Sequence, residues 1–281
     1  MPRVSVLTPI YNTNPQYLRE CIESILNQTF TDFEFLILND SPNNKEIENI
    51  VKEYAKHDKR IKYYKNEKNM GITPSRNKLL DLAKGEYLAI FDHDDISVPE
   101  RLEKQVKYLD ENPQVGVVSG WVEYFGEFSS ILKAPETDAV TKIFLTTKCV
   151  VPHTAAMIRK SVLINNNIEY EEYYTPCEDY RLWARLMDVT HFYNFQEVLV
   201  KYRFLPTNTS HKQSSQMAEK DLLIRNEICD SHMFLKQEYE HKYNLRTKFR
   251  LRLFGKIPLI KIKQDIVYLF EFIPLFKIRW K

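Results

Sequence analysis

The chain has 281 residues, 43% of them hydrophobic and 28% charged, so it can bury a full core and has the composition of a globular protein. Its four cysteines show no CxxC or metal-ligand spacing, which favours reduced thiols in a cytosolic protein over a zinc site or a disulfide framework. No stretch approaches the ~18 apolar residues of a transmembrane helix, and the N-terminus leads directly into a predicted strand, so we expect neither a membrane span nor a signal peptide.

The first half of the chain alternates strand patterns with amphipathic helix patterns. The predicted strands are Val4–Leu7, Phe33–Leu38, Ile61–Tyr64 and Tyr87–Phe91. Short connections separate these strands from helices that bury one apolar face each. This order predicts an α/β fold with a mainly parallel sheet flanked by helices.

The second half has a less regular pattern. Short strands are predicted around Val115–Ser119, Ala155–Ile158 and Val198–Tyr202, and a helix begins near Glu178. We expect this part to complete the sheet and to form the side of the site that binds a second substrate.

The end of the chain combines a long polar helix with a basic tail. The helix is predicted from Ser214 to Lys242, and Lys242–Lys281 contains 11 Lys/Arg against 2 Asp/Glu, a net charge of +9 against −7 for the rest. Leu253–Lys263 is echoed by Leu269–Arg279. Apolar stretches interleaved with Lys and Arg indicate a helical, amphipathic segment that lies on an anionic membrane. The alternative is a tail helix packed on its own domain with a solvated basic face.

Polar clusters follow four predicted strands of the first half. These clusters are Thr8–Asn12, Asn39–Pro42, Asn69–Asn77 and Asp92–Asp95. In open α/β sheets the ligand crevice lies at the carboxyl ends of the strands. The four loops are therefore expected to meet in one binding site.

The last of these loops crowds three carboxylates, those of Asp92, Asp94 and Asp95. Neighbouring acids repel one another, and a divalent cation such as Mn²⁺ or Mg²⁺ relieves the repulsion while also binding phosphate oxygens. An acidic turn that caps the helix near Pro99 is the alternative.

Taken in order, these loops resemble those of the family 2 glycosyltransferases, inverting enzymes with the nucleotide-sugar-binding GT-A fold. The resemblance is carried by Val4–Asn12, Leu38–Ser41, Asn69–Asn77, Phe91–Asp95 and Cys177–Trp183. It implies a Rossmann-like GT-A catalytic domain over residues 1–212. Residues 1–119 would be the nucleotide-sugar-binding half and 120–212 the acceptor-binding half, and 213–281 would be the helical, basic extension.

The resemblance assigns the base pocket to the first two loops. Thr8, Pro9 and Tyr11 would line the pocket, and Asp40 would accept a hydrogen bond from the nucleobase, which is uracil in the commonest donors. Most relatives read Asp-Asp-Gly-Ser in the second loop, whereas this chain reads Asn-Asp-Ser-Pro at positions 39–42. This departure leaves the nucleotide open.

The third loop would complete the donor site. Gly71 would allow close approach of the backbone, and Arg76 would bring positive charge toward the donor. An ordinary surface arginine on a helix is the alternative for Arg76.

The segment from Asp92 to Asp94 resembles the family's Asp-X-Asp motif. Asp94 would coordinate Mn²⁺ or Mg²⁺ through the diphosphate, and Asp92 would touch the ribose or a metal-bound water. Alternating side-chain directions point His93 away from the ion. His211 lies where relatives have a loop that closes over the donor, and it is a candidate third metal ligand or diphosphate contact.

The pair Glu178 and Asp179 matches the family's acidic pair at the start of a helix. Direct displacement at the anomeric carbon requires an acceptor hydroxyl that loses its proton as it attacks, and a positioned carboxylate contributes ~10²–10⁴-fold to such a step. Asp179 is the predicted general base, and Glu178 is predicted to contact or orient the acceptor. Favourable helix N-terminal charges are the alternative.

Three further residues are candidates for the acceptor side. Trp121 and Trp183 could stack on a sugar ring, although the core is the commoner place for a lone tryptophan. His153 resembles a position near the acceptor, with a structural histidine as the alternative.

The sequence therefore predicts an inverting, metal-dependent transferase that moves a sugar from a nucleoside-diphosphate sugar, a UDP-sugar, to a glycan acceptor in cell-surface glycan synthesis. We expect a cytoplasmic enzyme held at the inner face of the cytoplasmic membrane by its basic tail, and no nucleic acid partner. A sugar-1-phosphate nucleotidyltransferase is disfavoured because the first loop lacks glycine. A non-catalytic nucleotide-sugar-binding protein at the membrane is the other alternative.

Overall fold

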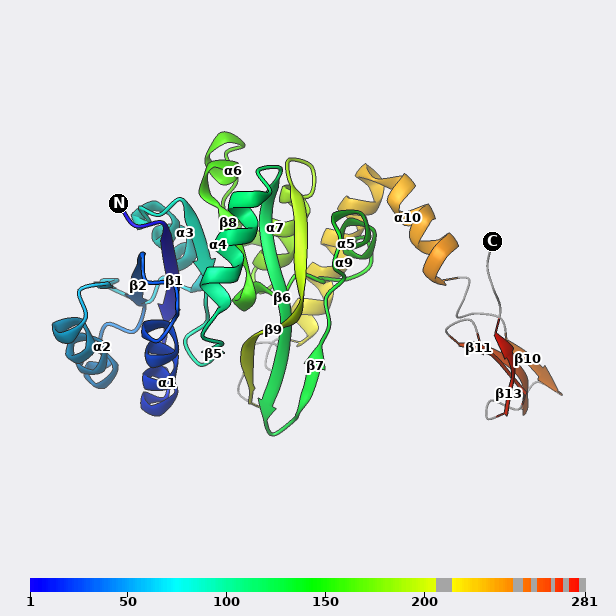
Figure 1. Cartoon of the computed structure of the whole chain (residues 1–281), viewed down its shortest axis with the longest axis horizontal. Coiled ribbons are helices and arrows are strands. Elements are labelled where there is room, and N and C mark those ends of the chain that lie inside the picture. Colours follow the sequence, from blue (N-terminus) through cyan, green and yellow to red (C-terminus); the bar gives the residue numbers. More distant parts are fainter. Residues whose placement is uncertain (206–213, 245–249, 254–256, 264–265, 270–272, 278–281) are drawn as a thin grey trace.

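A computed structural model describes residues 1–205, 214–244, 250–253, 257–263, 266–269 and 273–277 of the chain. A nine-stranded sheet forms its centre, in the order β3-β2-β1-β4-β8-β6-β9-β5, with β7 paired to β6 (Figure 1). The strands are β1 (Val4–Ile10), β2 (Phe33–Asn39), β3 (Ile61–Lys65), β4 (Tyr87–Ile90), β5 (Ile96–Ser97), β6 (Val115–Gly126), β7 (Ser130–Leu132), β8 (Met157–Arg159) and β9 (His191–Phe204).

The four strands predicted in the first half are present and parallel. β1 pairs with β2 and β4, and β2 pairs with β3, all in parallel register. Beyond β4 the sheet is mixed, because β8 runs antiparallel to both β4 and β6, while β6 and β9 are parallel. The boundary predicted between residues 119 and 120 falls inside β6, so both halves of the predicted catalytic domain build one sheet.

Helices cover both faces of this sheet (Figure 1). They are α1 (Pro15–Leu26), α2 (Lys45–His57), α3 (Ile72–Leu82), α4 (Arg101–Glu111), α5 (Asp138–Leu145), α6 (Lys160–Asn165) and α7 (Glu178–Leu186), with short 3₁₀ turns at His153–Ala155 and Glu172–Tyr174. The sequence explains where a helix begins, as α1 illustrates. The side chain of Asn14 caps the helix by accepting from the backbone N–H groups of Gln16 and Tyr17, and Pro15 fits the first turn.

Strand alternation divides the buried side chains into two cores. Val4 and Val6 of β1 pack with α1, α2 and α4 on one face, whereas Leu7 packs with α3, α6 and α7 on the other. Burial on both faces explains why the strands read as continuous apolar runs. The sheet is therefore covered on both faces, and its carboxyl edge carries the loops.

The C-terminal extension is only partly helical. The predicted long helix is present as α9 (Ser214–Ser231) and α10 (Met233–Tyr239), followed by a π-helical turn at Glu240–Asn244. Beyond it, the segment expected to be helical instead forms an antiparallel sheet of β10 (Arg250–Leu253), β11 (Ile257–Lys263), β12 (Ile266–Leu269) and β13 (Ile273–Lys277).

The composition of this basic segment explains the difference. Its repeat is rich in isoleucine and phenylalanine, alternates apolar with basic residues, and contains a proline in each copy, all of which favour strands over helix. Among the described residues, no helix is both long and apolar enough to span a bilayer.

Candidate active site

The carboxyl ends of β1, β2 and β4 carry the predicted donor loops. The Thr8 hydroxyl donates to the carbonyl of Phe91 at 2.9 Å, which ties the end of β1 to the start of the acidic loop. Pro9 lines a small pocket beside Arg76, and Tyr11 beyond it is half exposed. Thr8 is therefore a buried tether, Pro9 is buried as well, and of these three residues only Tyr11 borders open space.

Asp40 holds the third loop in place. It is buried, and its carboxylate accepts from the Asn66 side chain at 2.7 Å and from the backbone N–H groups of Met70 and Gly71 at 2.8 and 2.9 Å. Both carboxylate oxygens already have protein donors. A hydrogen bond from a nucleobase would have to share these oxygens.

Gly71 is the N-cap residue of α3, and its φ of 91° lies in a region that residues with a side chain rarely adopt. An added Cβ would meet no protein atom within 4 Å. The glycine is thus required by the backbone conformation, and the space in front of it is open to a ligand.

The acidic loop places its three carboxylates in different environments. Asp92 and Asp94 are partly exposed, whereas Asp95 is fully buried and accepts from the backbone N–H of Arg203 at 3.0 Å. Burial, and then the charges of Asp94 and Asp92, raise the pKa of Asp95 well above its ordinary value. Asp95 is therefore a structural link to β9, and Asp92 and Asp94 are left for a ligand.

Two arginines support this loop from within the protein. Arg101 is fully buried and donates to the carbonyls of Ile90 and Ala156 at 2.8 and 3.2 Å. Arg203 donates from Nε to the carbonyl of Asp94 at 3.0 Å and is ion-paired with Glu20. Sequence reasoning missed Arg101, because an arginine in the first turn of a helix gives no sign of being buried.

Arg76 connects the acidic loop with the second acidic pair. Its guanidinium is ion-paired with Glu178 through Nη1 and lies 3.3 Å from Asp92 through Nη2. Despite burial, the carboxylates of Glu178 and Asp92 raise the pKa of Arg76 above its ordinary value. The alternative of an ordinary surface arginine is excluded, since only 12% of the side chain is exposed.

Glu178 and Asp179 open α7, and Glu178 is the partner of this arginine. Glu178 is buried, and its Oε2 has no hydrogen-bond partner among the described residues. Burial, with the neighbouring Glu178 charge, raises the pKa of Asp179 to about 6, although Arg76 opposes the shift. A carboxyl group with this pKa is basic enough to take a proton and is still ionised at neutral pH.

The acceptor candidates are placed less favourably. Trp183 is fully buried and packs against His153 and Phe192, so its ring cannot stack on a sugar, and this corrects the prediction. Its core position follows from α7, which turns that face toward the sheet. Trp121 is partly exposed, with Lys133 over its ring at 4.7 Å.

His153 is buried, and its Nε2 lies 2.8 Å from the Tyr170 hydroxyl. Burial, with the charge of Arg76, holds the pKa of His153 well below its ordinary value, so the ring is neutral. This environment fits the structural alternative. His211 lies outside the described residues.

The acidic loop suits a divalent cation that takes most of its ligands from a substrate. Burial raises the pKa of Asp94, and the carboxylate of Asp92 adds to the rise, which is the repulsion that a cation relieves. The described residues contain no cluster of three or more His, Cys, Asp and Glu side chains that could hold a metal alone. Two carboxylates fit an ion completed by diphosphate oxygens and water.

Comparison with known proteins identifies relatives over most of the chain. The family model described as "Glycosyl transferase family 2" matches residues 5–165. An uncharacterized glycosyltransferase of Methanocaldococcus jannaschii is 42% identical over 210 residues, which cover 72% of this chain and 71% of that protein. The O-antigen biosynthesis glycosyltransferase WbnJ of Escherichia coli is 31% identical over 218 residues, covering 76% and 82%.

Solved structures share the fold. TarS of S. aureus, in complex with UDP-GlcNAc, superimposes with a TM-score of 0.63 at 21% identity and covers 86% of this chain and 76% of its own. The mannosyltransferase PcManGT of Pyrobaculum calidifontis, in complex with GDP-Man and Mn²⁺, gives 0.63 at 16% identity and covers 86% and 71%. These similarities confirm the predicted GT-A architecture.

Proposed function

The chain belongs to glycosyltransferase family 2, and we propose that it transfers a sugar from a UDP-sugar to a hydroxyl group of a cell-surface glycan with inversion at the anomeric carbon. The observation that carries this proposal is the position of Arg76 between Asp92 of the donor loop and Glu178 of the acidic pair. It brings the donor side and the base within one site. Relatives support the substrate classes, since TarS binds UDP-GlcNAc and WbnJ acts in O-antigen synthesis.

In this mechanism Asp179 removes the proton of the acceptor hydroxyl as its oxygen attacks the anomeric carbon. The nucleoside diphosphate leaves from the opposite face, so an α-linked donor gives a β-linked product without a covalent intermediate. The pKa of Asp179, raised to about 6, suits a general base that works near neutrality. Glu178, held by Arg76, orients the acceptor.

The residues that would hold Mn²⁺ or Mg²⁺ are Asp94 and, at the rim, Asp92. When bound, the ion supplies positive charge that offsets the charge on the departing diphosphate. The support for this assignment is the mutual repulsion of the two carboxylates and the Mn²⁺ in the PcManGT complex.

The donor nucleotide would lie across the ends of β1 and β2. Tyr11, which is half exposed, would border the space for the base, and the open face of Gly71 allows the backbone to approach the donor. Asp40 would share one of its oxygens with the base. The acceptor side includes Trp121, and the net charge of +9 on residues 242–281 supports attachment to an anionic membrane where a lipid-linked acceptor is held.

A donor panel tests the proposal. The full-length protein is incubated with UDP- and GDP-sugars and Mn²⁺, with and without glycan acceptors, and release of nucleoside diphosphate is measured. We expect slow hydrolysis of one UDP-sugar and faster turnover with a matching acceptor. Absence of both turnover and metal-dependent donor binding across the panel would reject the proposal.

A further inference from the structure

Tyr170 lies in a segment, residues 168–171, that belongs to no helix or strand. The side chain of Asn77 in α3 supplies the missing backbone partners: its Nδ2 donates to the Tyr170 carbonyl at 2.8 Å, and its Oδ1 accepts from the Tyr170 N–H at 2.9 Å. Two hydrogen bonds from one side chain fix both the position and the direction of this backbone. Tyr170 is thus attached to the helix that also carries Arg76.

The Tyr170 side chain is fixed as well. It is 2% exposed, and its hydroxyl is hydrogen-bonded to the neutral ring of His153 at 2.8 Å. The ring therefore has one position, determined by α3 at the backbone and by the His153–Ala155 turn at the hydroxyl.

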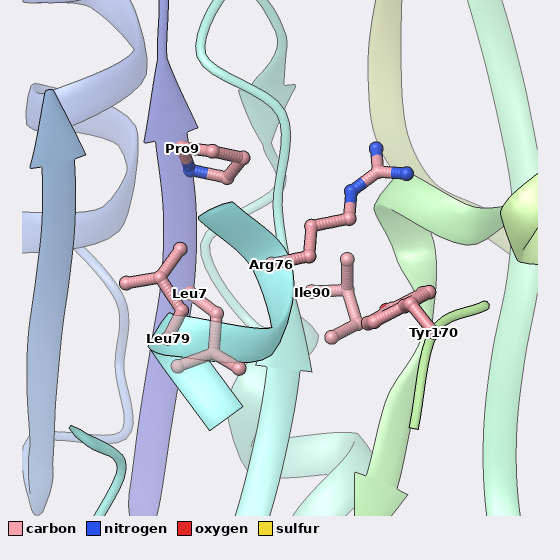
Figure 2. Close-up of a pocket in the computed structure, with 6 residues that line it drawn as sticks. All are labelled: Leu7, Pro9, Arg76, Leu79, Ile90 and Tyr170. Atoms are coloured by element: carbon pink, nitrogen blue, oxygen red, sulfur yellow. The ribbon is translucent and has the colours of Figure 1, made fainter. Parts of the chain in front are cut away.

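The guanidinium of Arg76 lies over this fixed ring, with its central carbon 5.7 Å from the ring centroid. Figure 2 shows both side chains in the pocket that Pro9 and Ile90 also line. The Nε of Arg76 is buried without a hydrogen-bond partner among the described residues. The guanidinium is therefore held by the two carboxylates and by the face of this aromatic ring.

The geometry points to Tyr170 as a positioning residue for sugar transfer, which acts by holding Arg76 against both Glu178 and Asp92. This role rests on the proposed function. Tyr170 does not face a substrate in this account. Without its ring, the long arginine side chain would gain other rotamers, and a displacement of about 1 Å in such a site can cost about 10²-fold in rate.

A double-mutant cycle tests this role. Donor turnover is measured for Tyr170→Leu, Tyr170→Phe, Arg76→Gln and the double variant Tyr170→Leu with Arg76→Gln. We expect Tyr170→Leu to lose about 10- to 100-fold in kcat/KM for the donor. Tyr170→Phe should lose clearly less, because the ring remains although its hydrogen bond to His153 is gone. Tyr170→Leu should add little once Arg76 is replaced. A purely structural role would give equal losses in both backgrounds.

Asn77→Ser tests the same support without touching the ring, and it serves if Tyr170→Leu does not fold. It should also lower turnover in the wild-type background and not in Arg76→Gln. Tyr173→Leu, at an exposed tyrosine three residues away, is the matched control and should be neutral.

Additive losses, or equal losses in the Phe and Leu variants, would overturn the role of Tyr170 and leave the proposed function standing. A wild-type protein without donor turnover would overturn both.

Discussion

Arg76 and Glu178 are ion-paired although 102 positions separate them in the sequence. Arg76 comes from α3 on the donor side, and Glu178 begins the helix that carries the proposed base. The same guanidinium also lies 3.3 Å from Asp92. A displacement of the donor loop can therefore change the position of Glu178, next to the proposed base, through one side chain.

The acid limb of the pH profile should report Asp179. The base works when deprotonated, and its pKa is raised to about 6, so kcat/KM should fall about tenfold per pH unit below 6 and level off above it. Initial rates between pH 4.5 and 8 at saturating Mn²⁺ measure this. An acid limb centred near pH 4 would mean that the environment of Asp179 does not raise its pKa.

Asp94→Ala should remove metal-dependent donor binding. With only Asp92 left, the ion loses its principal carboxylate, and the apparent affinity for Mn²⁺ in the presence of UDP should fall at least about tenfold. Calorimetric titration measures the affinity, and Asp81→Ala, at an exposed aspartate of α3, is the control. Unchanged Mn²⁺ affinity in Asp94→Ala would remove Asp94 from the metal site.

Asp40→Asn should destabilise the protein. The carboxylate now accepts hydrogen bonds from N–H groups of Asn66, Met70 and Gly71, and the NH₂ of the new amide would face one of these donors. The free energy of unfolding should therefore fall by about 1–3 kcal/mol. Urea denaturation measures it, with the exposed Asp81→Asn as control. Equal stability of the two variants would show that Asp40 does not hold the loop.

Truncation before Lys242 should release the protein from anionic vesicles. The removed segment has a net charge of +9, and each basic residue near such a surface contributes about 1 kcal/mol. Cosedimentation with phosphatidylserine vesicles, compared with neutral phosphatidylcholine vesicles and at rising salt, measures the attachment. Binding that salt leaves unchanged would argue against an electrostatic tail.

The architecture could be predicted because each strand and helix of the first half is locally consistent. The apolar runs at Val4–Leu7 and Phe33–Leu38 match buried parallel strands, and the polar residues after them lie at one edge. The helix predicted for the tail is wrong, because interleaved apolar and basic residues also fit an amphipathic helix, whereas their short alternation here forms strands.

Within the site, the residue types predicted which loops meet, but not which side chains are buried or already have hydrogen-bond partners in the protein. Trp183 could not be assigned from its identity, since burial depends on which face α7 turns to the sheet. Tyr170 lies in an irregular segment, and no sequence pattern around it indicates a role in the site. Its partner Asn77 does, because it ends the segment that resembles the family, yet its contact lies 93 positions away.

The central claim is that Asp179 is the general base of a glycosyltransferase. The most direct measurement compares kcat for transfer and the Kd for the donor in wild type, Asp179→Asn and Asp188→Asn, an exposed aspartate just beyond the same helix. We predict that Asp179→Asn lowers kcat about 10²–10⁴-fold with donor Kd unchanged, while Asp188→Asn resembles wild type. Near-normal turnover by Asp179→Asn would contradict the account.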